Sequence, residues 1–405
     1  MHILILTRQI GHYHDARYRG AHAVFERVSV VQTASEGGFA EFLATRVGDY
    51  ERHSLYDNRK AYDDALQSGD LPKDLSKLLD NISPDVIAVA GWANGESAAG
   101  IRWAKSKGIP IVMMSESQAD DASRSWVREK VKSHIVRMSD AAFVGGPPHA
   151  GYMQQLGMPK SQISFGYNAV DNKHFALGAK RARKNAAELR MEFRLPDSYF
   201  LASARFIAKK NLPALVAAHA VVSEKDPNTP ELVILGDGEE RTVIEQARSA
   251  HPEPETVHLL GFKGYDDLPV LYGLAAAFVH VSTVEQWGLV VNEAMSAGTP
   301  VIVSDKCGVA RTVLRDGING WITGTDQGEI ASALRRFNAM SEDERVIMGR
   351  SAAADFADWG PARFGSGLRE AAEIALAVHK PQVSLGLFDK LVLARIEKSS
   401  IDQVS

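Results

Sequence analysis

Two glutamates stand in a mostly apolar stretch of the 405-residue chain, VEQWGLVVNEAMSAGTP at residues 284–300. Seven residues separate Glu285 from Glu293. A carboxylate buried without a partner is costly, so both lie at a surface or face a cleft where a polar ligand compensates. The flanking residues predict a strand over 277–281, a helix over 289–297 and a strand over 301–304. Glu285 then lies at a strand's carboxyl end, and Glu293 lies on the helix.

The start of the predicted helix has the properties of an anion site. Gly288 allows a ligand to approach the backbone closely. The N–H groups of Trp287, Gly288, Leu289 and Val290 have no partner within the helix and favour a negative charge. A phosphate held there, beside two carboxylates that accept hydrogen bonds from hydroxyls, describes a nucleotide-sugar site.

Three further segments of the second half carry polar residues or glycines after a predicted strand. In SARFIAKKNLPALVAAHA, residues 203–220, Arg205 and Lys210 lie five apart around a turn, and Lys209 is the competing lysine. Gly236 and Gly238 follow a buried strand, although a G-x-G turn is a weak signal by itself. Phe262 and Lys263 follow the next strand.

The E-x7-E pattern with the following AMSAGTPVI resembles the signature of retaining glycosyltransferases of family 4, the group 1 glycosyltransferases, which have the GT-B fold. The resemblance implies that Glu285 contacts the hydroxyls of the donor sugar and Glu293 those of the ribose. It also implies that the backbone at Trp287, Gly288 and Leu289 holds the diphosphate and sugar.

The other segments fit the same family. Arg205 and Lys210 match its R-x4-K pair, which binds the leaving diphosphate, and we group them with Glu285 as catalytic. A fixed Arg and Lys stabilise that charge without a metal, so we expect no metal site and no cofactor besides the donor. By the same resemblance Gly236 and Gly238 lie under the nucleotide, and Phe262 and Lys263 contact the base.

The acceptor is expected to bind to the first half of the chain, where the match to the family is looser. Five candidate residues follow predicted strands: Gly11, His12, His14, Glu116 and His149. Glu116 could equally cap a helix. His12 and His14 would lie on opposite sides of an extended chain, so they do not form a metal-ligand pair.

Short β-branched runs alternate with helical segments throughout, which predicts an α/β protein with two doubly wound, Rossmann-like domains. We expect an acceptor-binding domain over 1–177, a donor-binding domain over 178–360, and a helical segment over 361–405 that packs back on the first domain. Strands are expected at 2–6, 28–31, 86–90, 109–113, 142–144, 200–203, 232–235, 256–260, 277–281 and 301–304.

Composition and charge are those of an ordinary globular protein. The net charge of −4 gives no sign of nucleic-acid binding. The single cysteine, Cys307, suits a reducing cytoplasm, and no apolar run predicts a transmembrane helix. We therefore expect a cytoplasmic protein, and a location at the inner face of the membrane stays open as an alternative. The stretch from Lys380 is weakly amphipathic, but Asp389 and Glu397 favour a packed helix over a membrane contact.

The function expected is retaining transfer of a sugar from a UDP- or GDP-sugar to a hydroxyl of a saccharide, a lipid-linked molecule or a small molecule. Front-face attack and a covalent intermediate both stay open, and the lack of an obvious nucleophile favours the first. The alternatives are a GT-B epimerase or phosphorylase and a non-catalytic nucleotide-sugar-binding subunit. A Rossmann-type dehydrogenase is disfavoured because no G-x-G-x-x-G follows the first strand.

Overall fold

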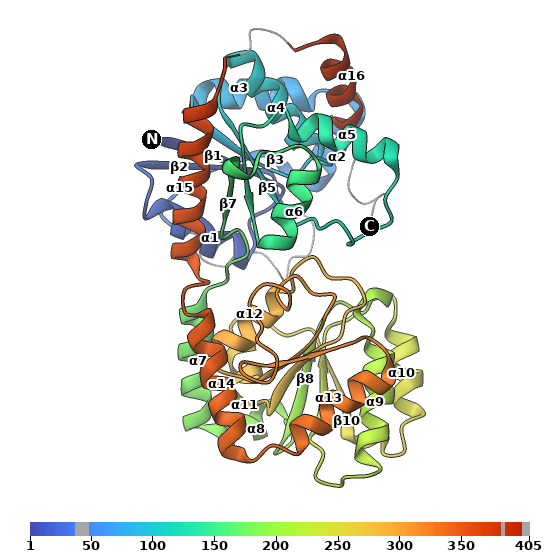
Figure 1. Ribbon diagram of the computed structural model, residues 1–405. Coiled ribbons are helices and arrows are strands. Elements are labelled where there is room, and N and C mark those ends of the chain that lie inside the picture. The colour runs from blue at the N-terminus through green and yellow to red at the C-terminus, as the bar shows by residue number, and fades with distance from the viewer. Residues whose placement is uncertain (37–47, 382–384, 399–405) are drawn as a thin grey trace. The chain divides into compact units, whose positions relative to one another are not determined.

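The computed structural model describes residues 1–36, 48–381 and 385–398, and the chain forms two compact units (Figure 1). The N-terminal unit contains Met1–Ala169 and the chain from Pro361 on, and the C-terminal unit contains Val170–Gly360. The expected boundary at 177 is wrong by eight residues, because it falls inside helix α7 (Asn172–Lys184). The whole of this helix belongs to the C-terminal unit, which begins at Val170. Asp171 caps the helix by accepting from the His174 N–H at 3.2 Å.

The described part of the N-terminal unit holds one parallel sheet in the order β3-β2-β1-β4-β5-β6-β7. Strands on both sides of β1 are reached by crossovers, which is the doubly wound pattern. The strands are β1 (His2–Thr7), β2 (Arg27–Glu36), β3 (Glu51–Asn58), β4 (Val86–Ala90), β5 (Ile111–Ser115), β6 (Ala141–Val144) and β7 (Ile163–Phe165).

Helices cover both faces of this sheet. One of them, α15 (Pro361–Val378), comes from the end of the chain and packs against α1 (His12–His22), as Figure 1 shows. Its apolar residues, such as Phe364 and Leu368, join the core that β1 and β4 form. The others are α2 (Arg59–Ser68), α3 (Leu71–Ile82), α4 (Gly95–Lys107), α5 (Trp126–Val136), α6 (Pro147–Gln155) and α16 (Leu387–Ile396).

The C-terminal unit has a second parallel sheet in the order β10-β9-β8-β11-β12-β13. Its strands are β8 (Tyr199–Ser203), β9 (Glu231–Leu235), β10 (Val257–Gly261), β11 (Ala277–His280), β12 (Val301–Ser304) and β13 (Trp321–Thr323). Besides α7, its helices are α8 (Ala186–Phe193), α9 (Leu212–Ser223), α10 (Arg241–Ser249), α11 (Leu268–Leu274), α12 (Leu289–Ser296), α13 (Gln327–Asn338) and α14 (Glu342–Phe356).

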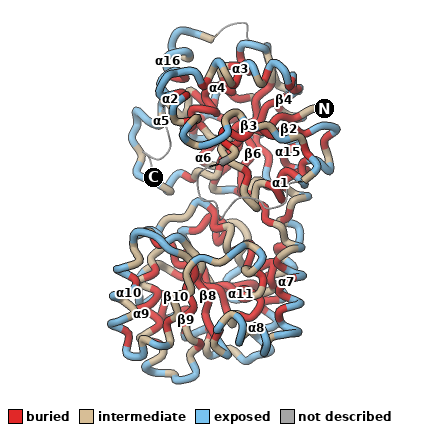
Figure 2. The backbone as a smooth tube through the Cα atoms, turned by 180° about the vertical axis from the view of Figure 1, so that it is seen from behind, coloured by how far each residue is buried: buried red, intermediate tan, exposed pale blue. Residues whose placement is uncertain are grey.

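Most strands of both units are buried (Figure 2), whereas the edge strand β3 is only partly covered. Every strand predicted from the sequence is present, with ends shifted by no more than two residues except at β2, which ends five residues later than predicted. Three strands were not predicted: β3, β7 and β13. The fold class, α/β with two doubly wound parallel sheets, is confirmed. None of the helices described is both long and apolar enough to span a membrane.

Candidate functional site

The candidate donor site begins where β8 and β11 end. These strands are parallel neighbours, so their carboxyl ends lie at one edge of the sheet. After β8 the chain forms a short 3-10 helix, Ala208–Lys210. The loop after β11 is tied to it, because the Thr283 N–H donates to the Lys209 carbonyl at 2.9 Å. This backbone contact positions Lys210 beside Glu285.

Four side chains then meet in what we call the Glu285 cluster: Lys210, His280, Ser282 and Glu285. Lys210 forms an ion pair with Glu285 through Oε2. The same oxygen lies 3.0 Å from His280 Nε2 and 3.4 Å from the Ser282 hydroxyl. Lys210 is 14% exposed and Glu285 is 16% exposed, so water screens the pair only in part. The predicted residues Lys210 and Glu285 are thus brought together.

The cluster keeps Glu285 ionised. Burial acts to raise the pKa of its carboxyl, but the hydrogen bond with His280 and the charge of Lys210 outweigh burial and bring the pKa well below its usual range. Burial lowers the pKa of His280, and its hydrogen bond with Glu285 opposes that shift. A neutral imidazole that donates from Nε2 to the carboxylate fits both directions. The cluster therefore carries a cation and an anion side by side.

The buried Cys307 lies next to the loop that carries Glu285. Residues 285 and 307 form an isolated parallel bridge between two loops. The thiol lies 3.4 Å from Ser304 Oγ, which also donates to the Ser282 carbonyl at 2.6 Å. Burial, together with the Glu285 charge, raises the pKa of this thiol to about 12, so it stays protonated. Cys307 therefore supports the loop that carries Glu285.

Helix α12 follows the Glu285 loop, and Gly288 forms its N-cap with φ at +99°, a conformation that favours glycine. Trp287 is fully buried rather than open to a ligand. Its indole stacks on Trp359 at 5.3 Å, and its N–H donates to Asn292 Oδ1 at 2.8 Å. Only the backbone of Trp287 is therefore left for the predicted donor contact. Leu289, the first residue of α12, is half-buried.

Glu293 lies on the inner side of α12 and is fully buried. One of its oxygens accepts from the hydroxyl of Tyr272, on α11, at 2.6 Å. A buried carboxylate needs such donors, because the desolvation of its charge is otherwise uncompensated. Tyr272 and Glu293 thus form a second polar site under the same helix.

Gly236 and Gly238 hold the turn after β9 against the segment that follows β8. Their φ angles are +122° and +153°. A Cβ at Gly236 would lie 1.9 Å from the Ala204 carbonyl oxygen, and one at Gly238 would lie 2.6 Å from the Phe206 oxygen. The Phe206 N–H also donates to the Asp237 carbonyl at 2.8 Å. The two glycines therefore allow a close backbone contact beside Arg205.

Three of the predicted donor residues are wholly or partly exposed around this turn. Arg205, just before Phe206, has an exposed side chain. Phe262 and Lys263 follow β10, where Phe262 is exposed and Lys263 is half-buried. The Gly236 N–H donates to the Gly261 carbonyl at 2.9 Å, which fixes this loop next to the glycine turn. These residues are open to a ligand, whereas Glu293 and the Trp287 ring are covered.

The N-terminal unit places the predicted acceptor residues after β1, β5 and β6. Gly11 is the N-cap of α1, and its N–H donates to His14 Nδ1 at 3.3 Å. The prediction that His12 and His14 lie in an extended chain is wrong, because both lie in the first turn of α1. Asp15 favours that helix start, since an acidic residue in the first turn interacts well with the helix dipole.

Glu116 and His149 have different surroundings. Glu116 follows β5 and lies 3.8 Å from the guanidinium of Arg17. His149, on α6, is fully buried. Arg17 is buried as well, donates to the Ala169 carbonyl at 3.1 Å and lies over the Tyr167 ring at 4.8 Å.

Sequence reasoning missed three polar residues that the structure places beside the predicted ones: His280, Ser282 and Tyr272. His280 and Ser282 bracket the end of an apolar strand, and that position was the available signal. Tyr272 gave no signal, since its contact with Glu293 depends on how α11 packs against α12.

Known proteins are similar to this chain in sequence and in fold. Residues 188–354 match the family model described as "Glycosyl transferases group 1". Glycogen synthase of Mycobacterium tuberculosis is 27% identical over 282 residues, which are 67% of this chain and 63% of that protein. The D-inositol 3-phosphate glycosyltransferase of Salinispora arenicola is 26% identical over 324 residues, covering 74% and 71%.

Among solved structures, HepE of Anabaena in complex with UDP superposes with a TM-score of 0.73 at 18% identity, covering 92% of this chain and all of that one. This likeness concerns the fold, and it confirms the expected GT-B architecture of two Rossmann-like units. The chain is thus similar to group 1 glycosyltransferases over residues 188–354, and it resembles known glycosyltransferases in sequence over a longer stretch.

Proposed function

We propose that the protein is a retaining glycosyltransferase of family 4 that transfers a sugar from a nucleoside diphosphate sugar to an acceptor hydroxyl. The observation that carries the proposal is the Glu285 cluster. Its largely buried lysine–carboxylate pair lies at the carboxyl ends of two parallel strands, beside the start of α12. This reaction requires a cation that binds the diphosphate and a hydrogen-bond acceptor for the hydroxyls of the donor sugar.

We assign the roles from the family resemblance together with these positions. Lys210, with the exposed Arg205, binds the diphosphate and stabilises the charge that develops on its β-phosphate as the anomeric bond breaks. Glu285 stays ionised and accepts hydrogen bonds from the sugar. The first turn of α12 donates backbone N–H groups to the phosphates. With these positive groups in place the reaction needs no metal.

The remaining donor contacts belong to the nucleotide. Gly236 and Gly238 give it room at the turn after β9, and Phe262 and Lys263 contact the base. Glu293 is assigned the ribose hydroxyls by the family resemblance; it is covered in this structure and held by Tyr272, so this contact requires a local rearrangement that uncovers its carboxylate. UDP-sugars are the first donors to test, since HepE binds UDP in its crystal structure. The acceptor hydroxyl is assigned to the N-terminal unit, around α1, Glu116 and His149.

A thermal-shift screen with UDP-, GDP- and ADP-sugars tests the donor site, because a ligand that binds the folded state at about 100 times its Kd stabilises it by about 2.7 kcal/mol. We expect one nucleotide class to raise the melting temperature of the wild type. Lys210→Ala should abolish the shift, while Lys209→Ala, at the exposed neighbouring lysine, should keep it. No shift with any nucleotide, or equal shifts in both variants, would refute the proposed site.

The reaction itself is tested on the donor found in that screen. Product NMR should show the anomeric configuration of the donor, and exhaustive chelation should leave the rate unchanged. Inversion or strict metal dependence would contradict the proposal. Conversion of the donor sugar without any acceptor would indicate an epimerase, and cleavage that requires phosphate would indicate a phosphorylase.

A further inference from the structure

Helix α16, near the C-terminal end of the chain, presents an apolar face that nothing in the described structure covers. Leu387, Phe388 and Leu391 are 77%, 60% and 61% exposed. They lie at positions i, i+1 and i+4, so they share one side of the helix. The opposite side carries Val392 and Leu393, which are buried in the core of the N-terminal unit. The helix therefore packs one apolar face into the core and exposes apolar side chains on the other.

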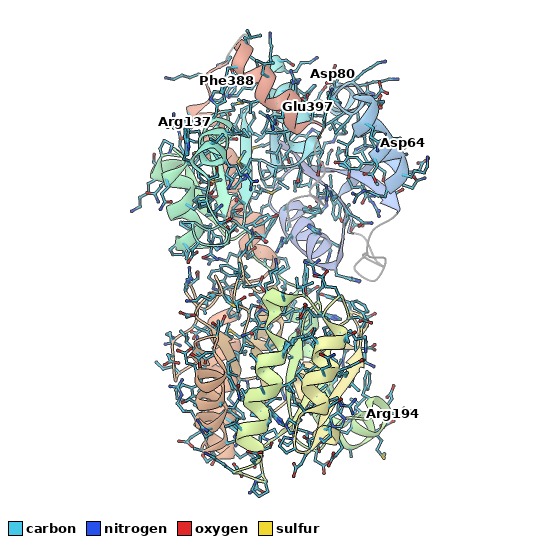
Figure 3. The ribbon with its side chains drawn as sticks, turned by 90° about the vertical axis from the view of Figure 1, so that its right-hand side faces the viewer. Asp64, Asp80, Arg137, Arg194, Phe388 and Glu397 are labelled. Carbon is cyan, nitrogen blue, oxygen red and sulfur yellow. The ribbon has the colours of Figure 1, made fainter. Side chains whose placement is uncertain are left out.

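The two acidic residues that favoured a simple packed helix point inward. Asp389 Oδ1 lies 2.5 Å from His134 Nε2 on α5. Glu397, just beyond the helix, accepts from Arg102 Nε and Nη2 of α4 at 2.6 and 2.9 Å. Figure 3 labels Phe388 near the start of α16 and Glu397 past its end. The outer face of α16 thus carries no uncompensated negative charge.

The charges on that outer face are positive. Lys390, Arg395 and Lys398 are exposed, and they have no acidic partner within the part of the chain that the structure describes. Arg395 follows Leu391 by one helical turn, so cations and leucines share the same side. Long basic side chains can extend from such a face to reach charges above it while their stems cover apolar surface.

The neighbouring helix α5 continues this pattern. His134 of α5 packs edge-on against the Phe388 ring, with 4.8 Å between the ring centroids, which holds the two helices together. At the start of α5, Trp126 is 75% exposed, and Val127 beside it is also exposed. Arg128 and Lys130 follow and are exposed too. Tryptophan suits a boundary between apolar and wet surroundings.

We propose that the outer face of α16, with the start of α5, docks on a lipid bilayer that carries anionic headgroups. Leu387, Phe388 and Leu391 enter the boundary between headgroups and acyl chains, as the apolar face of an interfacial helix does. Lys390, Arg395 and Lys398 pair with lipid phosphates, and each such cation strengthens binding about fivefold. Charge complementarity selects this occupant over a second copy of the chain, whose same face carries the same positive charge.

Vesicle flotation of the full-length protein tests this inference. We expect the wild type to float with vesicles of phosphatidylcholine and phosphatidylglycerol, to remain unbound with pure phosphatidylcholine, and to be released at high salt. Leu387→Ser/Leu391→Ser should weaken binding on the order of a hundredfold, since each leucine contributes about tenfold. This pair leaves Phe388 and its contact with His134 intact. Lys390→Glu/Arg395→Glu should weaken binding at least about 25-fold.

Ile347→Ser is the matched control, because this residue is an equally exposed aliphatic side chain on α14 of the C-terminal unit. It should float like the wild type. Far-UV circular dichroism and melting temperature verify that each variant is folded. The inference is overturned if the wild type does not bind anionic vesicles or if the double leucine variant binds them unchanged. It is also overturned if the wild type is a lipid-free dimer that the leucine substitutions dissociate, since this face would then join two copies.

Discussion

Replacing Lys210 by methionine tests the electrostatic balance of the Glu285 cluster. The variant keeps most of the aliphatic stem and removes the charge that faces Glu285. Breaking a buried ion pair costs about 3–5 kcal/mol. Here His280 and Ser282 remain next to the carboxylate and the pair is partly exposed. We therefore expect a loss of ~2 kcal/mol near pH 8, which lowers the melting temperature of the C-terminal unit by about 4–8 °C.

The loss should shrink as the pH falls. Burial is the main reason that the pKa of His280 lies below 6.5, with the Glu285 hydrogen bond opposing and the Lys210 charge adding to the shift. In the wild type, therefore, acidification protonates the unfolded state first, and His280 lowers stability as the pH falls below about 6.5. Without Lys210 the pKa of His280 rises, and its imidazolium pairs with Glu285. The variant therefore loses less stability on acidification than the wild type does. As a result, the difference between their free energies of unfolding narrows towards about pH 5.5.

Urea unfolding at about pH 8 and about pH 5.5, followed by tryptophan fluorescence, measures both gaps. The stacked Trp287 and Trp359 report on the C-terminal unit. Lys209→Met is the control, since this lysine is exposed and its side chain lies outside the cluster, and it should cost less than about 0.5 kcal/mol. Two results would refute the reasoning: a gap that is equal at both pH values, or a Lys210→Met/Glu285→Gln variant whose loss equals the sum of the single losses.

Two further predictions concern the elements around the cluster. Gly236→Ala should destabilise the protein by about 3 kcal/mol or more, because its Cβ would collide with the Ala204 carbonyl. Gly91→Ala is the control, since Gly91 is also at positive φ but in open space, and it should cost about 1–2 kcal/mol. Equal losses of stability in thermal unfolding would contradict this prediction. Tyr272→Phe removes a donor from the buried Glu293 carboxylate and should cost about 1–3 kcal/mol in urea unfolding. An unchanged midpoint would show that Glu293 does not depend on this hydroxyl.

The strands that were not predicted from the sequence have in common that their residues show no recognisable apolar pattern. β3 reads ERHSLYDN, and as an edge strand it buries little of its surface, so its side chains carry no apolar pattern. β7 and β13 have only three residues each, ISF and WIT, too few for any periodicity. In contrast, β4 and β12 are apolar on both faces, and their predicted bounds match the structure.

The same distinction applies to the site. Glu285 and Lys210 were predicted from their residue types and spacing together with the family resemblance, but their contact depends on β8 and β11 being neighbours, which is a property of the fold. His280 lies at the end of an apolar strand, where a lone histidine is as readily a core residue. The helix at His12 was missed because HYHDARYRGAH has no apolar stripe, and its stability comes from packing against α15.

The path of the chain between the units has a consequence for biosynthesis. The chain leaves the N-terminal unit at Ala169 and returns at Pro361, so the C-terminal unit is an insertion in the sequence of the other. The core around β1 lacks Phe364, Leu368 and the rest of α15 until those residues leave the ribosome. Domains commonly fold in the order in which they are synthesised. In this protein the first unit to be translated is the last to complete its core, and its unfinished sheet has to stay free of aggregation meanwhile.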